Sequence, residues 1–391
     1  MKQIIFLILT IVTGHTFARN GIEKALSDID HNNTTLSLMR EAMKADKLAN
    51  KTDIFLPDPE VGFNYLWGSL SVMGKRQDFS LSQTIDVPTV SGVKSRVADR
   101  KNDLLEWQYM ADRMNIMLEA KLYLIDLVYY NSLLKDLSVR KERAEAMVDG
   151  LKRRFDSGDA NLPEYNNSCL ELSKVCAEIQ QAETEKNALL AQLCRLNGGV
   201  SLSFDSCRFE EAGLPENFDE WFQVAQEKNP VLAYVRGEVE LSKQQLLLSK
   251  QQNLPSFSVG YMSEKTPGER YQGVSVGLSV PLWNSRNKIK QAKASLIAAE
   301  ARKHDAAVQF YGQLSVLYQR VAGLQQTAET YWRSLEKNDN SRLLKKALDA
   351  GQLSVSDYLL QTAIYYDSVD KALSAERDFQ KAFAELTAFE L

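Results

Sequence analysis

Residues 79–96, FSLSQTIDVPTVSGVKSR, contain a junction that occurs a second time in the chain. They form a short alternating apolar and polar run that ends in Val-Pro at 87–88 and leads into a long charged segment. Residues 274–291, VSVGLSVPLWNSRNKIKQ, repeat this order and end their alternating run in Val-Pro at 280–281. Alternation with period two indicates a strand, and the charged segments have helical composition, so the chain contains the same strand-to-helix junction twice.

The two junctions belong to a longer internal repeat. The Val-Pro pairs are 193 residues apart, and the same offset separates Gly158 from Gly351 and Tyr165 from Tyr358. Upstream, the Leu-Pro pairs at 56–57 and 254–255 differ by 198 residues, so the first half has about five extra residues there. A constant offset over such a length indicates a tandem duplication. We predict that residues 19–200 and 201–391 each have the order helix, two strands, long helix, turn, helix.

Composition and charge allow a substantial core and argue against nucleic-acid binding. The chain has 391 residues, of which 44% are hydrophobic and 25% charged, and its formal net charge is −4. It has neither a basic stripe nor a block of Lys and Arg, the features that nucleic-acid-binding proteins show. We therefore expect no nucleic-acid partner.

The first residues, MKQIIFLILTIVTGHTFARN, have the pattern of a secretory signal peptide at 1–18. Lys2 precedes an apolar run at 4–12 and a small-residue cleavage site at 16–18, and the run is too short to span a membrane. No cysteine stands at the cleavage site, so we expect no N-terminal lipid anchor. Elsewhere 18 apolar residues never run together. An exported protein with this pattern is periplasmic, secreted or an outer-membrane barrel.

Four segments alternate with the period of a strand, at about 61–72, 77–87, 256–263 and 272–280. Period two places one set of side chains on each face of a sheet. The predicted apolar face carries Phe63, Tyr65, Trp67, Phe79, Leu81, Ile85, Phe257, Val259, Tyr261, Val276 and Leu278. The predicted polar face carries Asn64, Ser80, Ser82, Thr84, Ser258, Ser275 and Ser279.

Two interpretations of these strands remain open at this point. They form soluble hairpins with one face covered by helices, or they form a membrane barrel wall with lipid on the apolar face and a wet lumen on the other. Four strands cannot close a barrel, because even the smallest barrels need about eight. If the strands belong to a barrel, several chains must share it.

The helical segments are long. Residues 90–155 and 287–350 contain no proline and two glycines each, and each segment would span about 100 Å if continuous. Further helical pattern precedes the strands of each half, at 22–51 and 216–252. Heptad spacing predicts two seams of antiparallel coiled-coil hairpins. Their members are Leu317, Val321, Leu324, Ala328, Tyr331 and Leu335, and Val355, Leu359, Thr362, Tyr366, Val369 and Leu373.

The four cysteines do not suggest a metal site. Cys169 and Cys176 are too far apart along a helix to form a disulfide, and none of the three histidines is near a cysteine in sequence. We expect the cysteines to be buried and to pack as small hydrophobic side chains. Cys194 and Cys207 flank an Asn-Gly-Gly loop, and the sequence does not decide whether they form a disulfide.

Patterns that would indicate an enzyme are weak. The sequence has no H-E-x-x-H, P-loop or C-x-x-C pattern. Residues 273–277, GVSVG, match G-x-S-x-G, but a nucleophile elbow places its serine on a sharp turn, whereas Ser275 lies inside an alternating strand. Asp58 and Glu60 are explained better by a proline-fixed helix-to-strand turn than by a pair of catalytic carboxylates. We expect no enzymatic activity and no cofactor.

The order of these elements resembles the TolC family of outer-membrane efflux proteins, over nearly all of the chain after the signal peptide. The resemblance rests on the duplication, on two strands with a Val-Pro exit in each half, and on two kinds of segment. Helices end at LPDPEVGFNYLW (56–67) and NLPSFSVGYM (253–262), and helical hairpins turn at DSGDANLPEY (156–165) and DAGQLSVSDYLLQT (349–362).

The resemblance implies a homotrimer in which three chains contribute four strands each to a twelve-stranded barrel. A helical tunnel then continues the barrel across the periplasm. It also implies that a periplasmic adaptor docks on the hairpin tips. Those positions are Gly158, Asp159, Ala160, Asn161 and Leu162, with Gly351, Gln352, Leu353, Ser354 and Val355.

In such proteins acidic residues near the tips close the tunnel. The matching positions here are Asp357 and, in the first half, Glu164. Leu360 stands where a second acid is expected, and Leu353 stands where an arginine is expected. These departures put a gate built on arginine links in doubt.

We therefore expect the passive exit duct of a tripartite efflux system in the outer membrane of a Gram-negative bacterium. It would work with a periplasmic adaptor and an inner-membrane pump, for instance a resistance–nodulation–division exporter of heavy metals or drugs. The alternatives are the outer-membrane duct of a type I protein secretion system and a soluble periplasmic coiled-coil adaptor or scaffold.

Overall fold

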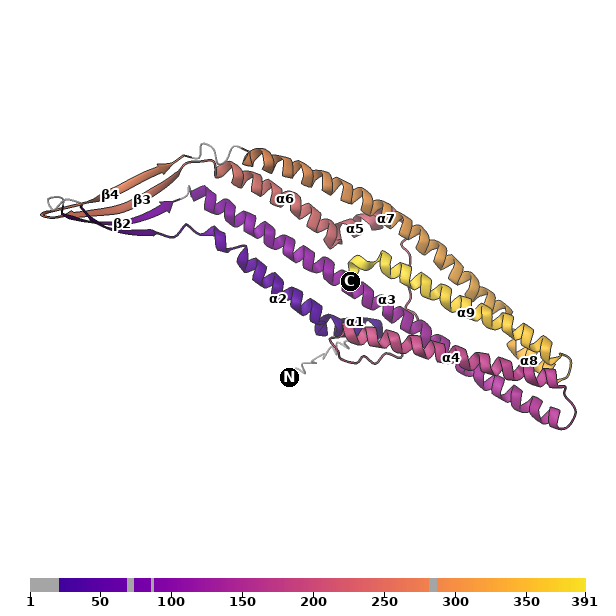
Figure 1. The fold of residues 1–391 in the computed structure, drawn as a ribbon. Coiled ribbons are helices and arrows are strands. Elements are labelled where there is room, and N and C mark those ends of the chain that lie inside the picture. Colours follow the sequence, from indigo (N-terminus) through magenta and orange to yellow (C-terminus); the bar gives the residue numbers. More distant parts are fainter. Residues whose placement is uncertain (1–20, 69–73, 86–87, 281–286) are drawn as a thin grey trace, which may run out of the picture. The chain divides into compact units, whose positions relative to one another are not determined.

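The fold is described by a computed structural model, shown in Figure 1, for residues 21–68, 74–85, 88–280 and 287–391. The signal peptide predicted at 1–18, Val87 and Pro281 of the two Val-Pro pairs, and the end of the strand predicted to reach residue 72 lie outside the described residues.

The elements occur in the predicted order. The first half contains α1 (Gly21–Asn32), α2 (Thr34–Ala49), β1 (Glu60–Trp67), β2 (Lys75–Ile85), α3 (Pro88–Asp156) and α4 (Leu162–Leu196). The second half contains α5 (Phe218–Lys228), α6 (Pro230–Gln251), β3 (Ser256–Thr266), β4 (Glu269–Ser279), α7 (Lys288–Asn338), α8 (Ser341–Asp349) and α9 (Val355–Leu386). Short 3₁₀ turns lie at Thr52–Ile54 and Ala388–Glu390.

Polar residues divide the helical pattern that precedes each pair of strands into two helices. Asn33 lies between α1 and α2, and its side-chain amide donates to the Leu196 carbonyl over 2.7 Å. Asn229 lies between α5 and α6, where its side chain accepts from the backbone N–H groups of Val231 and Leu232 and so caps α6. A side chain that satisfies the free N–H groups of a first turn marks a helix start.

The chain divides into two compact units that do not coincide with the two halves of the sequence. One unit contains residues up to 34, 117–212 and 323–384, and the other contains 35–116, 213–322 and 385–391. Helices α3 and α7 each begin in the unit that contains the strands and continue in the other.

The unit with the strands contains one four-stranded antiparallel sheet in the order β1-β2-β3-β4 (Figure 1). β2 pairs with β3 from Gln77↔Lys265 to Ile85↔Phe257, so the central ladder joins the two halves of the chain. Within the described residues, β1 and β4 are each paired on one side only.

The helices of the same unit are held by an aromatic cluster that the sequence pattern does not reveal. The Phe218 ring lies within 5.2–6.0 Å, centre to centre, of four others, including Tyr318 and Tyr311 of α7. Trp221 packs on Phe389, 5.6 Å away. Aromatic pairs at these separations add to the stability that burial already gives, so the cluster fixes α5 against α7 and the C-terminal turn.

The other unit is a helical assembly with an apolar core. Leu124, Leu127 and Val128 of α3 and Leu193 of α4 are fully buried. All twelve residues of the predicted heptad seams are buried or half-buried, ten of them in this unit, with Leu317 and Val321 in the unit with the strands. α3 contains 69 residues, about 100 Å of helix.

The second long helix differs from the sequence prediction. α7 ends at Asn338, and a separate short helix, α8, carries the chain to the turn. The expectation of one continuous helix up to residue 350 is therefore wrong, because a new helix begins at Ser341, whose N–H donates to the carboxylate of the preceding Asp339 over 3.0 Å.

The cysteines also differ from the prediction of buried side chains. All four are free, Cys176 is exposed, and Cys169, Cys194 and Cys207 are half-buried. Val175 takes the inward position of α4, so Cys176, about 100° further round the helix, points outward. Cys194 likewise follows the fully buried Leu193.

Candidate channel wall and helical tips

The strand register brings the predicted apolar side chains together on one face of the sheet. Directly opposed residues of an antiparallel pair share a face. Leu81 lies opposite Val61 of β1 and Tyr261 of β3, and Val259 lies opposite Val276 of β4. The remaining predicted apolar residues continue these rows: Phe63, Tyr65, Trp67, Phe79, Ile85, Phe257 and Leu278.

This apolar face is exposed in the single chain. Trp67 is 76% exposed, Val276 75% and Phe257 50%. The interpretation of soluble hairpins covered by helices requires this face to be buried. Its exposure instead makes it a contiguous surface that needs an apolar environment.

The predicted polar residues share the opposite face. Thr84 opposes Ser258, and Asn64 opposes Asp78. The other members are Ser80, Ser82, Ser275 and Ser279. A Cβ atom at Gly260 would lie 2.7 Å from the Ser275 hydroxyl oxygen and from the Leu81 carbonyl oxygen, so only glycine fits this position. Serines packed against glycines line much of this face with hydroxyl groups, and the exposed Leu66 and Met262 also lie on it.

The two helical tips share one turn chemistry at the predicted positions. Gly158 and Gly351 have φ values of +81° and +69°, a region that glycine adopts without strain. The N–H of Asp159 bonds to the Arg154 carbonyl at 2.7 Å, and the N–H of Gln352 bonds to the Ala347 carbonyl at 2.9 Å. Such bonds, with a glycine at the turn, define a Schellman end at both helices.

The helices that leave the tips are capped at equivalent positions. The Asn161 side chain accepts from the Glu164 N–H at 2.8 Å, and the Ser354 hydroxyl accepts from the Asp357 N–H at 3.1 Å. The same hydroxyl donates to the Asp357 carboxylate over 2.7 Å. Asp357 is exposed and Glu164 half-buried, and each lies in the first turn of its helix.

Most of the predicted docking residues are accessible. Gly158, Asp159, Asn161, Leu162, Gly351, Gln352 and Ser354 are exposed, and Ala160 and Leu353 are half-buried. Val355 differs, because it is only 6% exposed and belongs to the seam of α9.

Arg140 of α3 forms a buried link to α9 that sequence reasoning missed. Its side chain is 4% exposed and bonds to the carboxylates of Asp136 and Asp370, the latter at 3.1 Å through Nη1. The guanidinium carbon also lies 4.4 Å from the centre of the Tyr366 ring. Burial alone would lower the pKa of Arg140, but the hydrogen bond to Asp370 and the charges of both acids outweigh burial and raise it.

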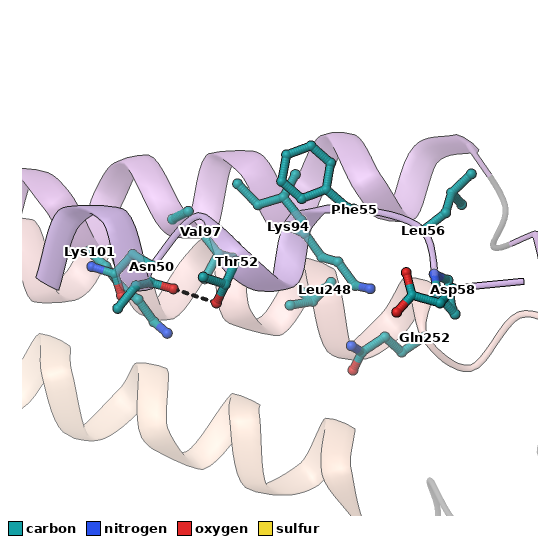
Figure 2. Close-up of a pocket in the computed structure, with 14 residues that line it drawn as sticks. Asn50, Thr52, Phe55, Leu56, Asp58, Lys94, Val97, Lys101, Leu248 and Gln252 are labelled. Carbon is teal, nitrogen blue, oxygen red and sulfur yellow. Dashed lines mark hydrogen bonds between the residues drawn. The ribbon is translucent and has the colours of Figure 1, made fainter. Parts of the chain in front are cut away.

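An open cavity of about 860 Å³ lies near the start of β1 (Figure 2). It is lined by the end of α2, the segment that leads to β1, α3 and α6. Lys94, Lys101 and Asp58 are its charged residues, and Phe55 and Leu56 are among its apolar ones (Figure 2).

Two further sequence patterns and the candidate metal ligands can be compared with the described residues. Ser275 of the G-x-S-x-G match lies in the middle of β4, opposite Gly260, and not on a turn. Within the described residues, no group of three or more His, Cys, Asp or Glu side chains could hold a metal ion. No described helix combines the length and hydropathy that a membrane crossing requires.

One sheet with an exposed apolar face, joined to long helical hairpins that turn at paired tips, is the fold of TolC-like outer-membrane channels. Solved structures with this fold cover 94–95% of the chain: CusC (12% identity, 92% of that chain, TM-score 0.73), the open state of the Neisseria gonorrhoeae MtrE channel (13%, 88%, 0.70) and the Campylobacter jejuni CmeC channel (15%, 84%, 0.67).

A sequence comparison gives a second kind of relative. The chain is 24% identical over 256 residues to the alkaline protease secretion protein AprF of Pseudomonas aeruginosa. The match covers 60% of this chain and 53% of AprF, so the chain spans about half the length of this curated relative. No family model matches the sequence.

Proposed function

We propose that the chain is one subunit of a trimeric exit duct in the outer membrane of a Gram-negative bacterium. The observation that carries the proposal is the exposed apolar face of a four-stranded sheet. Lipid would cover this face, while the hydroxyl-lined face would border a water-filled lumen. Three copies, joined edge to edge between β1 and β4, would close a barrel of twelve strands.

The helical tips support a role for a periplasmic adaptor. They are exposed, they lie at the ends of long helices, and the same turn occurs twice in each chain. Docking of an adaptor on nine of the predicted residues, without the buried Val355, would connect the duct to an inner-membrane pump. The duct itself would make and break no bonds, and the energy for export would come from the pump.

The proposed cargo is a small solute. If the partner is a resistance–nodulation–division pump, we expect this solute to be a heavy metal or a drug. The AprF match favours a second candidate, the outer-membrane duct of a type I protein secretion system. Deleting the gene in its native host distinguishes the two, because one predicts sensitivity to solutes and the other loss of a secreted protein.

Membrane fractionation and native mass test the duct directly. Outer-membrane location and a mass near three chains after detergent extraction are expected. Leu81→Arg, which places a charge on the apolar face, should block assembly, because Arg in the middle of a barrel's lipid face costs about 2–4 kcal/mol. Asn64→Arg places the same charge on the polar face opposite Asp78 and should assemble. A soluble monomer, or normal trimers from Leu81→Arg, would contradict the proposal.

We also propose that Asp357 helps to close the tunnel near the tips, with Glu164 at the equivalent position of the first half. Asp357→Asn removes the charge, whereas Ser354→Ala removes the helix cap and keeps the charge. Single-channel recording should show a higher basal conductance for Asp357→Asn alone. Equal conductance in both variants and the native duct would leave the Asp357 carboxylate only its hydrogen bond from the Ser354 hydroxyl.

A further inference from the structure

Charged side chains are sorted by sign between the two faces of the sheet. The four strands contain eight charged residues, and the register assigns each to a face. All four acids lie on the polar face: Glu60, Asp78, Glu264 and Glu269. Three of the four basic residues, Lys75, Lys265 and Arg270, lie on the apolar face, where no strand acid accompanies them.

The single basic residue of the polar face has protein partners. Arg76 Nε lies 2.8 Å from Asp78 and 3.1 Å from Glu264. By contrast, Lys75, Lys265 and Arg270 are exposed, and among the described residues none of them has an ion-pair partner. Within the described residues, the three basic side chains on the apolar face are therefore not paired with any acid.

These three cations form a compact group. Lys265 lies directly opposite Arg270, and Lys75 is a diagonal neighbour of Lys265, since Gln77 opposes Lys265. Directly opposed side chains are about 5 Å apart at Cβ, diagonal ones about 7–8 Å, and like charges in direct opposition destabilise a sheet. An anion between them would remove this repulsion.

The group lies at one edge of the apolar face. From Ile85 to Gln77, β2 advances eight residues, about 27 Å along the strand, or about 20 Å of membrane depth at the tilt usual in barrels. This is close to the apolar band of about 25 Å that such barrels present to lipid. Tyr65 and Trp67 flank the basic group, as aromatic side chains do where a barrel meets the headgroups.

We propose that Lys75, Lys265 and Arg270 bind the phosphate groups of the glycolipid in the outer leaflet of the outer membrane. The inference rests on the proposed duct: the helices join the sheet at the other ends of the strands, so the hairpin ends would face the cell surface. Arg270 offers a planar fork of N–H donors that matches phosphate, and the two lysines add point charges. Each trimer would carry three such sites on its outer surface.

Native mass spectrometry of the detergent-extracted trimer tests the site with purified lipid A, in the presence of a chelator that removes divalent cations. The probe is used with its two phosphates and after their removal. Each cation near a membrane surface contributes about fivefold, so the phosphorylated form should bind about a hundredfold more tightly. This comparison needs no variant. Equal binding of the two forms, or displacement of lipid A by an equal concentration of inorganic phosphate, would overturn the proposal.

Variants test whether the three residues cause the preference for phosphorylated lipid A. K75Q/K265Q/R270Q should lose this preference, and K75R/K265R/R270K, which keeps the charges, should retain most of it. R76Q is the matched control, because it removes a charge at the same end of β2 from the opposite face. Retention of the preference in the first variant, or its equal loss in R76Q, would overturn the proposal. A wild-type chain that forms no membrane trimer would remove the proposed duct as well, whereas a trimer without phosphate preference would remove this inference alone.

Discussion

The two helical hairpins of the chain have the same turn, but the helices that lead to the turn differ. α3 reaches the first tip without interruption, whereas the second tip is reached through α7, a break, and the short helix α8. Around each turn the chemistry is equivalent, from the Schellman glycine to the capping residue and the acid in the first turn of the next helix. Turn geometry and helix continuity are therefore encoded separately.

Two residues account for the difference. Asp339 and Asn340 of the second half stand at the offset of 193 residues from Ala146 and Met147 of the first. Alanine and methionine favour a helix interior, while aspartate and asparagine compete with the backbone for hydrogen bonds and favour helix starts. Beyond the break the core position is kept, because Leu344 and its counterpart Leu151 are both buried.

The largest effect is expected from the link between the hairpins. Arg140→Met removes the cation from α3 and leaves Asp136 and Asp370 without their partner. Breaking a fully buried pair costs about 3–5 kcal/mol. Asp370 is 41% exposed and Asp136 32%, so we expect about 2 kcal/mol, measured as a lower thermal midpoint of the extracted protein.

Arg143→Met is the matched control for this link. Arg143 lies one turn further along α3 and donates to the Tyr366 hydroxyl over 3.1 Å at an exposed position. Its loss should cost only a few tenths of a kcal/mol. Equal destabilisation by the two variants would mean that Arg140 does not hold α3 to α9 in the way the geometry indicates.

The turn glycines should respond alike if the two tips are equivalent. Gly158→Val and Gly351→Val each force a β-branched residue into a left-handed conformation, at a cost of about 1–2 kcal/mol. Because no other group lies within 4 Å of a Cβ atom at either position, the cost is one of conformation and not of collision. Trimers should remain, and export should fall. Normal export in both variants would remove the tips from the docking surface.

The turns and the seams could be predicted from the sequence because both are encoded by residues close together in the chain. Gly158, Asn161 and their counterparts act within a few residues of themselves, and the heptad at 317–335 repeats along one helix. The two faces of the sheet followed from the alternation. The strands β3 and β4 extend further toward their shared turn than predicted, because the alternation of apolar residues ends before the charged Lys265 and Arg270.

The features that the sequence did not predict depend on residues far apart in the chain or on weak local signals. Arg140 and Asp370 are 230 residues apart, and a single sequence contains nothing that pairs them. The break before α8 does have a local signal, the Asn-Asp-Asn-Ser run at 338–341, which is a weaker helix breaker than proline or glycine. Cys176 was predicted to be buried from residue type alone, which does not say which side of a helix a residue occupies.

The smallest effect is expected from exchanging the residues that distinguish the hairpins. Asp339→Ala with Asn340→Met should join α7 to α8 and stabilise this region by about 0.5–1 kcal/mol, since both replacements favour a helix interior. Ala146→Asp with Met147→Asn should interrupt α3 at the equivalent place. Hydrogen exchange at the backbone amides of 339–349 should slow in the first variant, and exchange at 146–156 should quicken in the second. If 339–349 keeps its exchange rate while 146–156 changes, the break before α8 is imposed by packing and not by the two residues.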